Sequence, residues 1–170
     1  MNSKKGMLKI RTSSTEQTQR LGYHLGSLAK GGDIFLLTGN LGAGKTCLVQ
    51  GISFGLGVKE YACSPSFMIA REYHGRLTLY HLDLYRLDHI EEVADLGIEG
   101  YLNSNTVCAI EWAEKGCGVL PQDNLSILMR YASENERNIT FKPRGQRFLE
   151  LVRQFKEALE NDDEIKWNFQ

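Results

Sequence analysis

Residues 36–51 read LLTGNLGAGKTCLVQG, and this stretch sets the expectation for the whole fold. Within it, Gly39–Thr46 fits the pattern G-x-x-x-x-G-K-[ST] of a phosphate-binding loop. The glycines let backbone N–H groups turn inward without a Cβ in the way. A helix that starts near Lys45 adds its own free N–H groups and the positive end of its dipole. The stretch therefore predicts an anion site, in which Lys45 reaches the β- and γ-phosphates and the Thr46 hydroxyl holds Mg²⁺.

The segments on either side of the loop have the pattern that this motif requires. DIFLLT at 33–38 is typical of a buried strand. KTCLVQGISFGL at 45–56 repeats apolar residues at helical spacing, namely Leu48, Val49, Ile52 and Leu56. A strand before the loop and a helix after it distinguish a phosphate-binding loop from an ordinary glycine-rich turn.

Composition narrows the class of protein. The chain has 170 residues, of which 42% are hydrophobic and 24% charged, as expected for one globular domain with a real core. The formal net charge of −1 gives no overall basic footprint, so we expect any link to nucleic acid to be indirect. The sequence shows no membrane-spanning run and no signal peptide. The four cysteines form no C-x-x-C pair, which indicates neither a zinc site nor a disulfide framework and favours the cytoplasm.

Helical and strand patterns alternate along the chain. Helical spacing predicts helices over 15–29, 88–98 and 145–160 in addition to the one after the loop. Ser14 or Thr15 is the candidate cap of the first, and Asp88 of the second. We expect strands at 106–112, 124–132 and 137–142, and a hairpin within 66–87 that turns at 74–76.

These elements predict an α/β fold, in which a P-loop NTPase-like mixed β-sheet is flanked by helices. No repeat and no long linker divides the chain, so we expect a single domain over residues 1–170. The polar tail at about 161–170 is left without a predicted element.

Two acidic residues end predicted strands and are candidates for work at the metal. Glu111 follows the apolar run 107–110, and an acid at the end of a strand beside the loop's own strand would face Mg²⁺. Asp83 ends the run LTLYHLD and would lie on the γ-phosphate side. We favour a functional role for both acids over that of solvated strand ends. Arg71 and Arg86 could supply positive charge, but we interpret them as ordinary surface arginines.

Five segments occur in one order along the chain: GNLGAGKT, SPSF at 64–67, YHLDLYRL at 80–87, EEVADLGIEGYL at 91–102 and IEWAEKGCGVLP at 110–121. Together they resemble the TsaE (YjeE) family, small bacterial P-loop ATPases needed for threonylcarbamoyladenosine formation at position 37 of tRNA. The resemblance runs from about residue 12 to about residue 143. It implies that ATP and Mg²⁺ are the cofactors and that a TsaB–TsaD-type complex is the partner, with tRNA reached indirectly.

The resemblance also implies roles for individual residues. Lys45 and Asp83 would be catalytic, and Thr46 and Glu111 would hold the metal. The segment SPSF would be a switch-like loop that senses the γ-phosphate. The nucleotide-binding residues that it implies are Thr15, Gly39, Leu41, Gly42, Ala43, Gly44, Lys45, Thr46, Cys47, Ser66 and Trp112.

The chain departs from the family pattern at four positions. Asn40 stands where Asp is usual, Cys47 where Thr or Ser is frequent, Ser66 where Thr is usual, and Leu82 where Phe is usual. None of these changes removes a group that the chemistry needs. A thiol is only a weak donor, so Cys47 is a weaker contact for the α-phosphate.

Other readings of the same motif remain open from the sequence. A small-molecule P-loop kinase is the enzyme alternative, with a lid formed by Arg130, Arg137, Arg144 and Arg147. That stretch alternates as strands do, which argues against a mobile lid. The chain has no D-x-x-G switch and no N-K-x-D segment, so ATP is favoured over GTP.

A nucleotide-gated interaction module is a further reading, and it overlaps with the family resemblance. We hypothesise that residues 64–67 order when ATP and Mg²⁺ are bound and relax with ADP. A protein partner would then read the state of the nucleotide.

Overall fold

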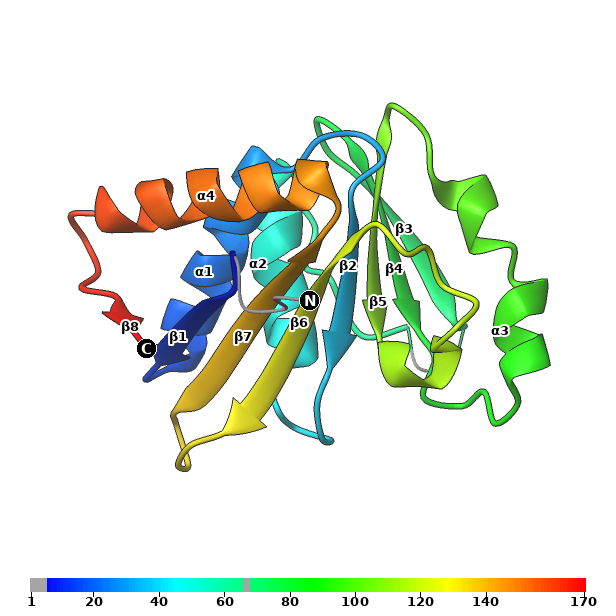
Figure 1. Cartoon of the computed structure of the whole chain (residues 1–170), viewed down its shortest axis with the longest axis horizontal. Helices are drawn as coiled ribbons and strands as arrows, with labels where there is room; N and C mark the ends of the chain where they lie inside the picture. Colours follow the sequence, from blue (N-terminus) through cyan, green and yellow to red (C-terminus); the bar gives the residue numbers. More distant parts are fainter. Residues whose placement is uncertain (1–5, 66–67) are drawn as a thin grey trace.

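The computed structural model describes residues 6–65 and 68–170. Their strands form one eight-stranded sheet in the order β3-β4-β5-β2-β6-β7-β1-β8 (Figure 1). The middle of the sheet is parallel: β2 (Ile34–Thr38) lies between β5 (Thr106–Glu111) and β6 (Asn124–Tyr131), and β4 (Thr78–Asp83) pairs with β5. The near-continuous apolar runs of β2 and β5 are buried on both faces, as central parallel strands require.

Antiparallel strands extend the sheet on both sides. β3 (Ala70–His74) pairs with β4 in the predicted hairpin, and β7 (Arg137–Arg144) pairs with β6. Two further strands complete one edge: β1 (Leu8–Thr12) pairs with β7, and the short β8 (Asn168–Phe169) pairs with β1. The predicted α/β fold with a mixed sheet is confirmed, whereas β1 and β8 had no counterpart in the prediction.

Three helices pack on one face of the sheet. α1 (Thr15–Leu28) and α2 (Lys45–Gly55) lie behind the strands in Figure 1. α4 (Gln146–Glu160) joins them through Phe155, whose ring centroid lies 5.1 Å from that of Phe141 on β7. α1 and α2 approach closely because glycines line their contact. A Cβ on Gly51 would lie 2.0 Å from the Gln19 carbonyl oxygen.

The predicted helix at 88–98 is shorter than expected, and its cap is wrong. α3 (Ile90–Asp95) begins after His89, and Asp88 lies before the cap. The Glu92 carboxylate accepts the backbone N–H groups of Asp88 and His89 at 3.0 and 2.9 Å, so a side chain inside the helix satisfies them. Gly97, at φ 59°, ends the turn, and two short 3₁₀ segments follow at η1 (Ile98–Tyr101) and η2 (Ala113–Gly116).

The other predicted helices agree closely with the structure. Ser14 caps α1, because its hydroxyl accepts the Gln17 N–H at 3.1 Å. None of the helices in the described ranges is both long and apolar enough to cross a membrane.

Candidate functional site

A cleft of 400 Å³ opens where the parallel strands end. Because β4, β5 and β2 run in the same direction, their carboxyl ends meet at one edge of the sheet, beside the loop that joins β2 to α2. Its lining residues are Leu41, Gly42, Gly44, Lys45, Thr46, Cys47, Ser64, Asp83, Tyr85, Arg86, Glu111 and Trp112. The fold thus brings together the predicted phosphate loop and both predicted acids.

Backbone conformation shapes the loop. Gly39 has φ 146° and Gly44 has φ 99°, and a Cβ on Gly39 would lie 2.4 Å from the Met129 carbonyl oxygen. Gly44 precedes α2 and provides no side-chain cap, so the first N–H groups of that helix receive no hydrogen bond from the capping residue. From outside the cleft, Arg137 Nε donates to the Ala43 carbonyl at 3.2 Å. The loop is therefore held in place while its helix start faces the cleft, as an anion site needs.

Lys45 is drawn into the loop. Its ammonium donates to the carbonyls of Gly39 and Asn40 at 2.6 and 3.1 Å, and it lies 4.0 Å from the centre of the Trp112 ring. The side chain is 4% exposed. Burial lowers the pKa of Lys45, and the nearby carboxylates, Glu111 first, partly offset that effect. An anion at the loop would favour the charged form of this lysine.

Glu111 is fixed from two sides. Its Oε1 accepts the Thr46 hydroxyl at 2.8 Å, and the same oxygen lies 2.8 Å from His81 Nε2. Both Glu111 and His81 are buried. His81 Nδ1 has no hydrogen-bond partner among the residues that the structure describes. Nε2 is therefore the nitrogen placed to donate, and it sets the orientation of the Glu111 carboxylate.

Asp83 lies beside Glu111 in the strand register but has different partners. Its Oδ2 accepts the Ser64 hydroxyl at 2.7 Å, and its Oδ1 accepts the Tyr85 N–H at 2.9 Å. The side chain is buried. Asp83 is thereby connected to the predicted switch-like segment. Ser66, the predicted nucleotide contact in that segment, lies outside the described residues.

Comparison with known proteins identifies a family that matches most of the chain. The family model for "Threonylcarbamoyl adenosine biosynthesis protein TsaE" matches residues 12–139. The chain belongs to the TsaE family. The resemblance predicted from the five segments is confirmed.

Individual TsaE proteins match over most of their length. The tRNA threonylcarbamoyladenosine biosynthesis protein TsaE of Treponema pallidum (strain Nichols) is 42% identical over 127 residues, which cover 75% of this chain and 94% of the relative. The protein of the same name from Bacillus subtilis (strain 168) is 42% identical over 142 residues, covering 83% and 89%. The crystal structure of Bacillus subtilis YdiB superposes with a TM-score of 0.79 at 37% identity, covering 89% of this chain and 95% of that one.

The donors at the cleft of this TsaE chain fit Mg²⁺. Thr46 and Glu111 offer a hydroxyl and a carboxylate oxygen that already lie within hydrogen-bond distance of each other. Such hard oxygen ligands suit Mg²⁺, which in nucleotide sites takes its remaining ligands from phosphates and water. The described residues contain no cluster of three or more His, Cys, Asp and Glu side chains for a metal.

Other predicted site residues of the TsaE chain lie around the cleft rather than in it. Gly39 and Ala43 line a neighbouring hollow on the far side of the loop. Thr15 shares a small cavity with Cys47, whose thiol donates to the Thr15 carbonyl at 3.4 Å. Burial raises the pKa of Cys47 to about 11, so the thiol stays neutral and is a weak donor at most.

Sequence reasoning missed three residues in or directly behind the TsaE cleft. His81 has the same strand parity as Asp83, and that spacing was the available signal. The Tyr85 ring contacts the Trp112 ring at a tilt of 49° with centroids 4.9 Å apart, and Trp112, whose φ is a left-handed 57°, places its ring against Lys45. Arg86, interpreted as a surface residue, lines the cleft, whereas Arg71 on β3 does not.

Proposed function

We propose that this chain is the ATP-binding and ATP-hydrolysing component of the cytoplasmic machinery that makes N6-threonylcarbamoyladenosine at position 37 of tRNA. Membership of the TsaE family supports the role in this modification. One observation carries the ATPase part. Lys45, the bonded pair Thr46–Glu111 and Asp83 converge on a single cleft at the carboxyl edge of the sheet.

The roles of these residues follow from their chemistry. Lys45 exchanges its loop carbonyls for β- and γ-phosphate oxygens, and the start of α2 adds backbone N–H donors. Thr46 and Glu111 would hold Mg²⁺, which would neutralise charge that develops on the phosphates. Asp83 orients a water and accepts its proton as the water oxygen bonds to the γ-phosphorus. The bond from that phosphorus to the β–γ bridging oxygen breaks, and ADP and phosphate leave.

The kinase alternative has less support. Its lid required Arg130, Arg137, Arg144 and Arg147 to move together over an acceptor. The first three lie on β6 and β7, and Arg147 opens α4. Arg137 is bonded to the phosphate loop, and Arg147 pairs with the buried Asp33 at 2.6 Å. These contacts favour structural roles.

The partner in this proposal is a TsaB–TsaD-type complex that reads the nucleotide state. Support comes from the hydrogen bond between Ser64 and Asp83, because it links a surface segment to the acid at the γ-phosphate side. A change at Asp83 on hydrolysis would reach that segment.

The test measures phosphate release from ATP and Mg²⁺ by the purified protein, alone and with TsaB–TsaD and tRNA, together with the modified nucleoside. We expect slow release alone, faster release with the partners, and loss of both activities in Lys45→Ala. Lys156→Ala, on the exposed side of α4, is the matched control. Unchanged turnover in a folded Lys45→Ala protein, or a phosphorylated small acceptor in place of free phosphate, would contradict the proposal.

A further inference from the structure

In the described part of the chain, no helix covers the face of the sheet opposite α1, α2 and α4 over the strands β1, β6 and β7 (Figure 1). Strand register identifies the residues that point there: Leu128 pairs with Thr140, and Thr140 pairs with Lys9. Their neighbours in sequence, such as Ile10, Ile127 and Phe141, are buried on the helical side. We call this surface the open face; its residues are Ser126, Leu128, Arg130, Asn138, Thr140, Lys142, Arg144, Lys9 and Arg11.

The open face is strongly basic. Five of its residues are cations, namely Lys9, Arg11, Arg130, Lys142 and Arg144, and none is acidic. All except Arg11 are exposed, and none of the five forms an ion pair within the described part of the chain. Because the whole chain has a net charge of −1, the remainder of the molecule is negative. The near-neutral net charge of the chain is therefore the sum of a basic open face and a negatively charged remainder.

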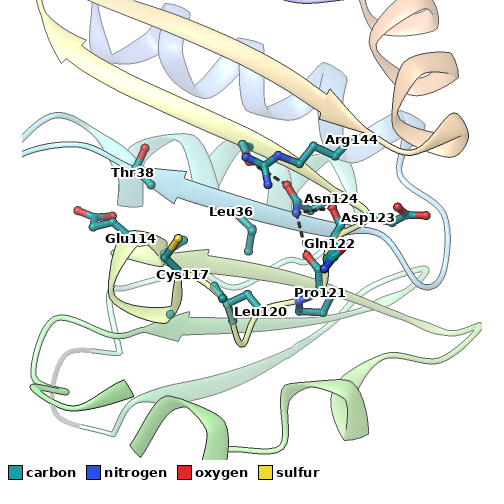
Figure 2. Close-up of a pocket in the computed structure, with 14 residues that line it drawn as sticks. Leu36, Thr38, Glu114, Cys117, Leu120, Pro121, Gln122, Asp123, Asn124 and Arg144 are labelled. Atoms are coloured by element: carbon teal, nitrogen blue, oxygen red, sulfur yellow. Dashed lines mark hydrogen bonds between the residues drawn. The ribbon is translucent and has the colours of Figure 1, made fainter. Parts of the chain in front are cut away.

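A hollow of 720 Å³ borders the open face at β2 (Figure 2). Its floor includes Leu36 and Ser126, and segment 113–123 forms its wall. Asn124 fixes that wall by donating to the Pro121 and Gln122 carbonyls at 2.8 and 3.0 Å. The acids Glu114 and Asp123 lie on this wall, and Glu114 also lines a second hollow beside Arg130 of the open face. Arg144 lies where the first hollow meets the open face.

We infer that the open face binds the phosphate backbone of an RNA, and therefore that this protein contacts the tRNA directly. The choice of tRNA rests on the proposed function, whereas the charge and the polar donors do not. Lys and Arg interleaved with Ser, Thr and Asn side chains are the groups that contact phosphates and sugars. An interface with an acidic protein would instead centre on aromatic or aliphatic anchors. Here the open face offers only the half-buried Leu128.

The test compares two double variants that remove equal charge. Lys9→Gln with Lys142→Gln neutralises the middle of the open face, and Arg153→Gln with Lys156→Gln does the same on the exposed side of α4. Binding of a fluorescent unmodified tRNA transcript is followed by anisotropy at several salt concentrations. We expect the first variant to bind about tenfold more weakly and to lower the slope of log affinity against log salt by about 1–2. The α4 variant stays within about twofold of the unaltered protein.

Each other result overturns the inference. Equal loss in both variants would mean a diffuse charge effect, and an unaltered protein that does not bind the transcript at low salt would leave no RNA site. Unchanged tRNA affinity with weakened TsaB–TsaD binding would assign the open face to an acidic protein. Phosphate release is measured in the same variants, which leave the cleft intact. Its absence in the unaltered protein would identify a failure of the proposed function instead.

Discussion

At the scale of single residues, Glu111 and Asp83 occupy equivalent positions on adjacent parallel strands yet differ in their partners. Glu111 is hydrogen-bonded to the Thr46 hydroxyl, and Asp83 to the Ser64 hydroxyl and the Tyr85 N–H. We therefore expect Glu111→Gln to weaken nucleotide binding only when Mg²⁺ is present. Asp83→Asn should retain binding and lower phosphate release at least about 100-fold, because it removes a proton acceptor.

Titration of a fluorescent ATP analogue with and without Mg²⁺, beside a phosphate-release assay, separates the two variants. The same loss of binding in both would show that the division of roles is wrong.

His81 positions Glu111, and its contribution can be measured apart from stability. Loss of a group that orients a metal ligand commonly costs about tenfold or more in metal affinity. We expect His81→Ala to raise the Mg²⁺ concentration needed for half-maximal nucleotide binding by about tenfold. His24→Ala is the control, because His24 is largely buried and, like His81, paired with a carboxylate, here Asp162, far from the cleft. A shift of equal size in both variants would reduce His81 to a packing residue.

The sequence identified the loop and both acids because a fixed local spacing encodes them. It could not identify what holds them. The contacts of Glu111 with His81 and with Thr46 join residues 30 and 65 positions apart, and they depend on the register between strands. No local periodicity carries that register. Tyr85 and Trp112 meet for the same reason, across two different strand ends.

At the scale of elements, the segments with clear apolar patterns were predicted well. The two strands at one edge of the sheet, β1 and β8, were not predicted. β1 has five residues that alternate between apolar and polar, a short strand pattern that the prediction did not use, and β8 has two residues, too few for a periodic signal. β8 exists because Phe169 lies opposite Ile10 and because the Gln170 N–H donates to the Lys9 carbonyl at 2.9 Å. Trp167, just before it, is buried against His24. The segment that composition marks as a polar tail is therefore packed against α1 and β1.

Asp162 anchors this C-terminal segment, and its ionisation gives the anchor a pH dependence. Burial alone would raise its pKa, but hydrogen bonds from His24 and Arg20 outweigh burial and lower it from 3.8 to about 2. Because the folded pKa lies below the unfolded value, the stabilisation is complete above about pH 4. It is lost as the pH falls towards 2 and amounts to about 2 kcal/mol.

We therefore expect Asp162→Asn to lower the free energy of unfolding at pH 7 and to leave it nearly unchanged relative to the unaltered protein at pH 2. Urea denaturation of both proteins between pH 2 and pH 7 gives the difference, in which the other carboxylates cancel. A difference that is independent of pH would show that the ionised carboxylate contributes nothing.

At the scale of the whole molecule, the strand order decides where function lies. β2 is central, and the loop after it lies beside the ends of β4 and β5. Sequence patterns indicate parallel and hairpin strands, yet they do not state which strand borders which. Local motifs therefore predicted the loop and both acids of the cleft, whereas the open face could not be predicted. Its cations come from β1, β6 and β7, which are adjacent only in the folded sheet.

A cleft built on the central strands couples nucleotide binding to the stability of the whole sheet. A ligand that binds only the folded chain at about 100 times its dissociation constant stabilises it by about 2.7 kcal/mol. In a chain of this size that corresponds to a rise of about 5–10 °C in the midpoint of thermal unfolding. We expect a non-hydrolysable ATP analogue with Mg²⁺ to produce this rise, chelation of Mg²⁺ to reduce it, and Lys45→Ala to abolish it.

Asp162→Asn is the matched control, because it lowers the starting midpoint through the distant C-terminal anchor while the cleft keeps its residues. An equal rise in Lys45→Ala would place the nucleotide elsewhere, and a reduced rise in Asp162→Asn would show that this substitution disturbs the cleft.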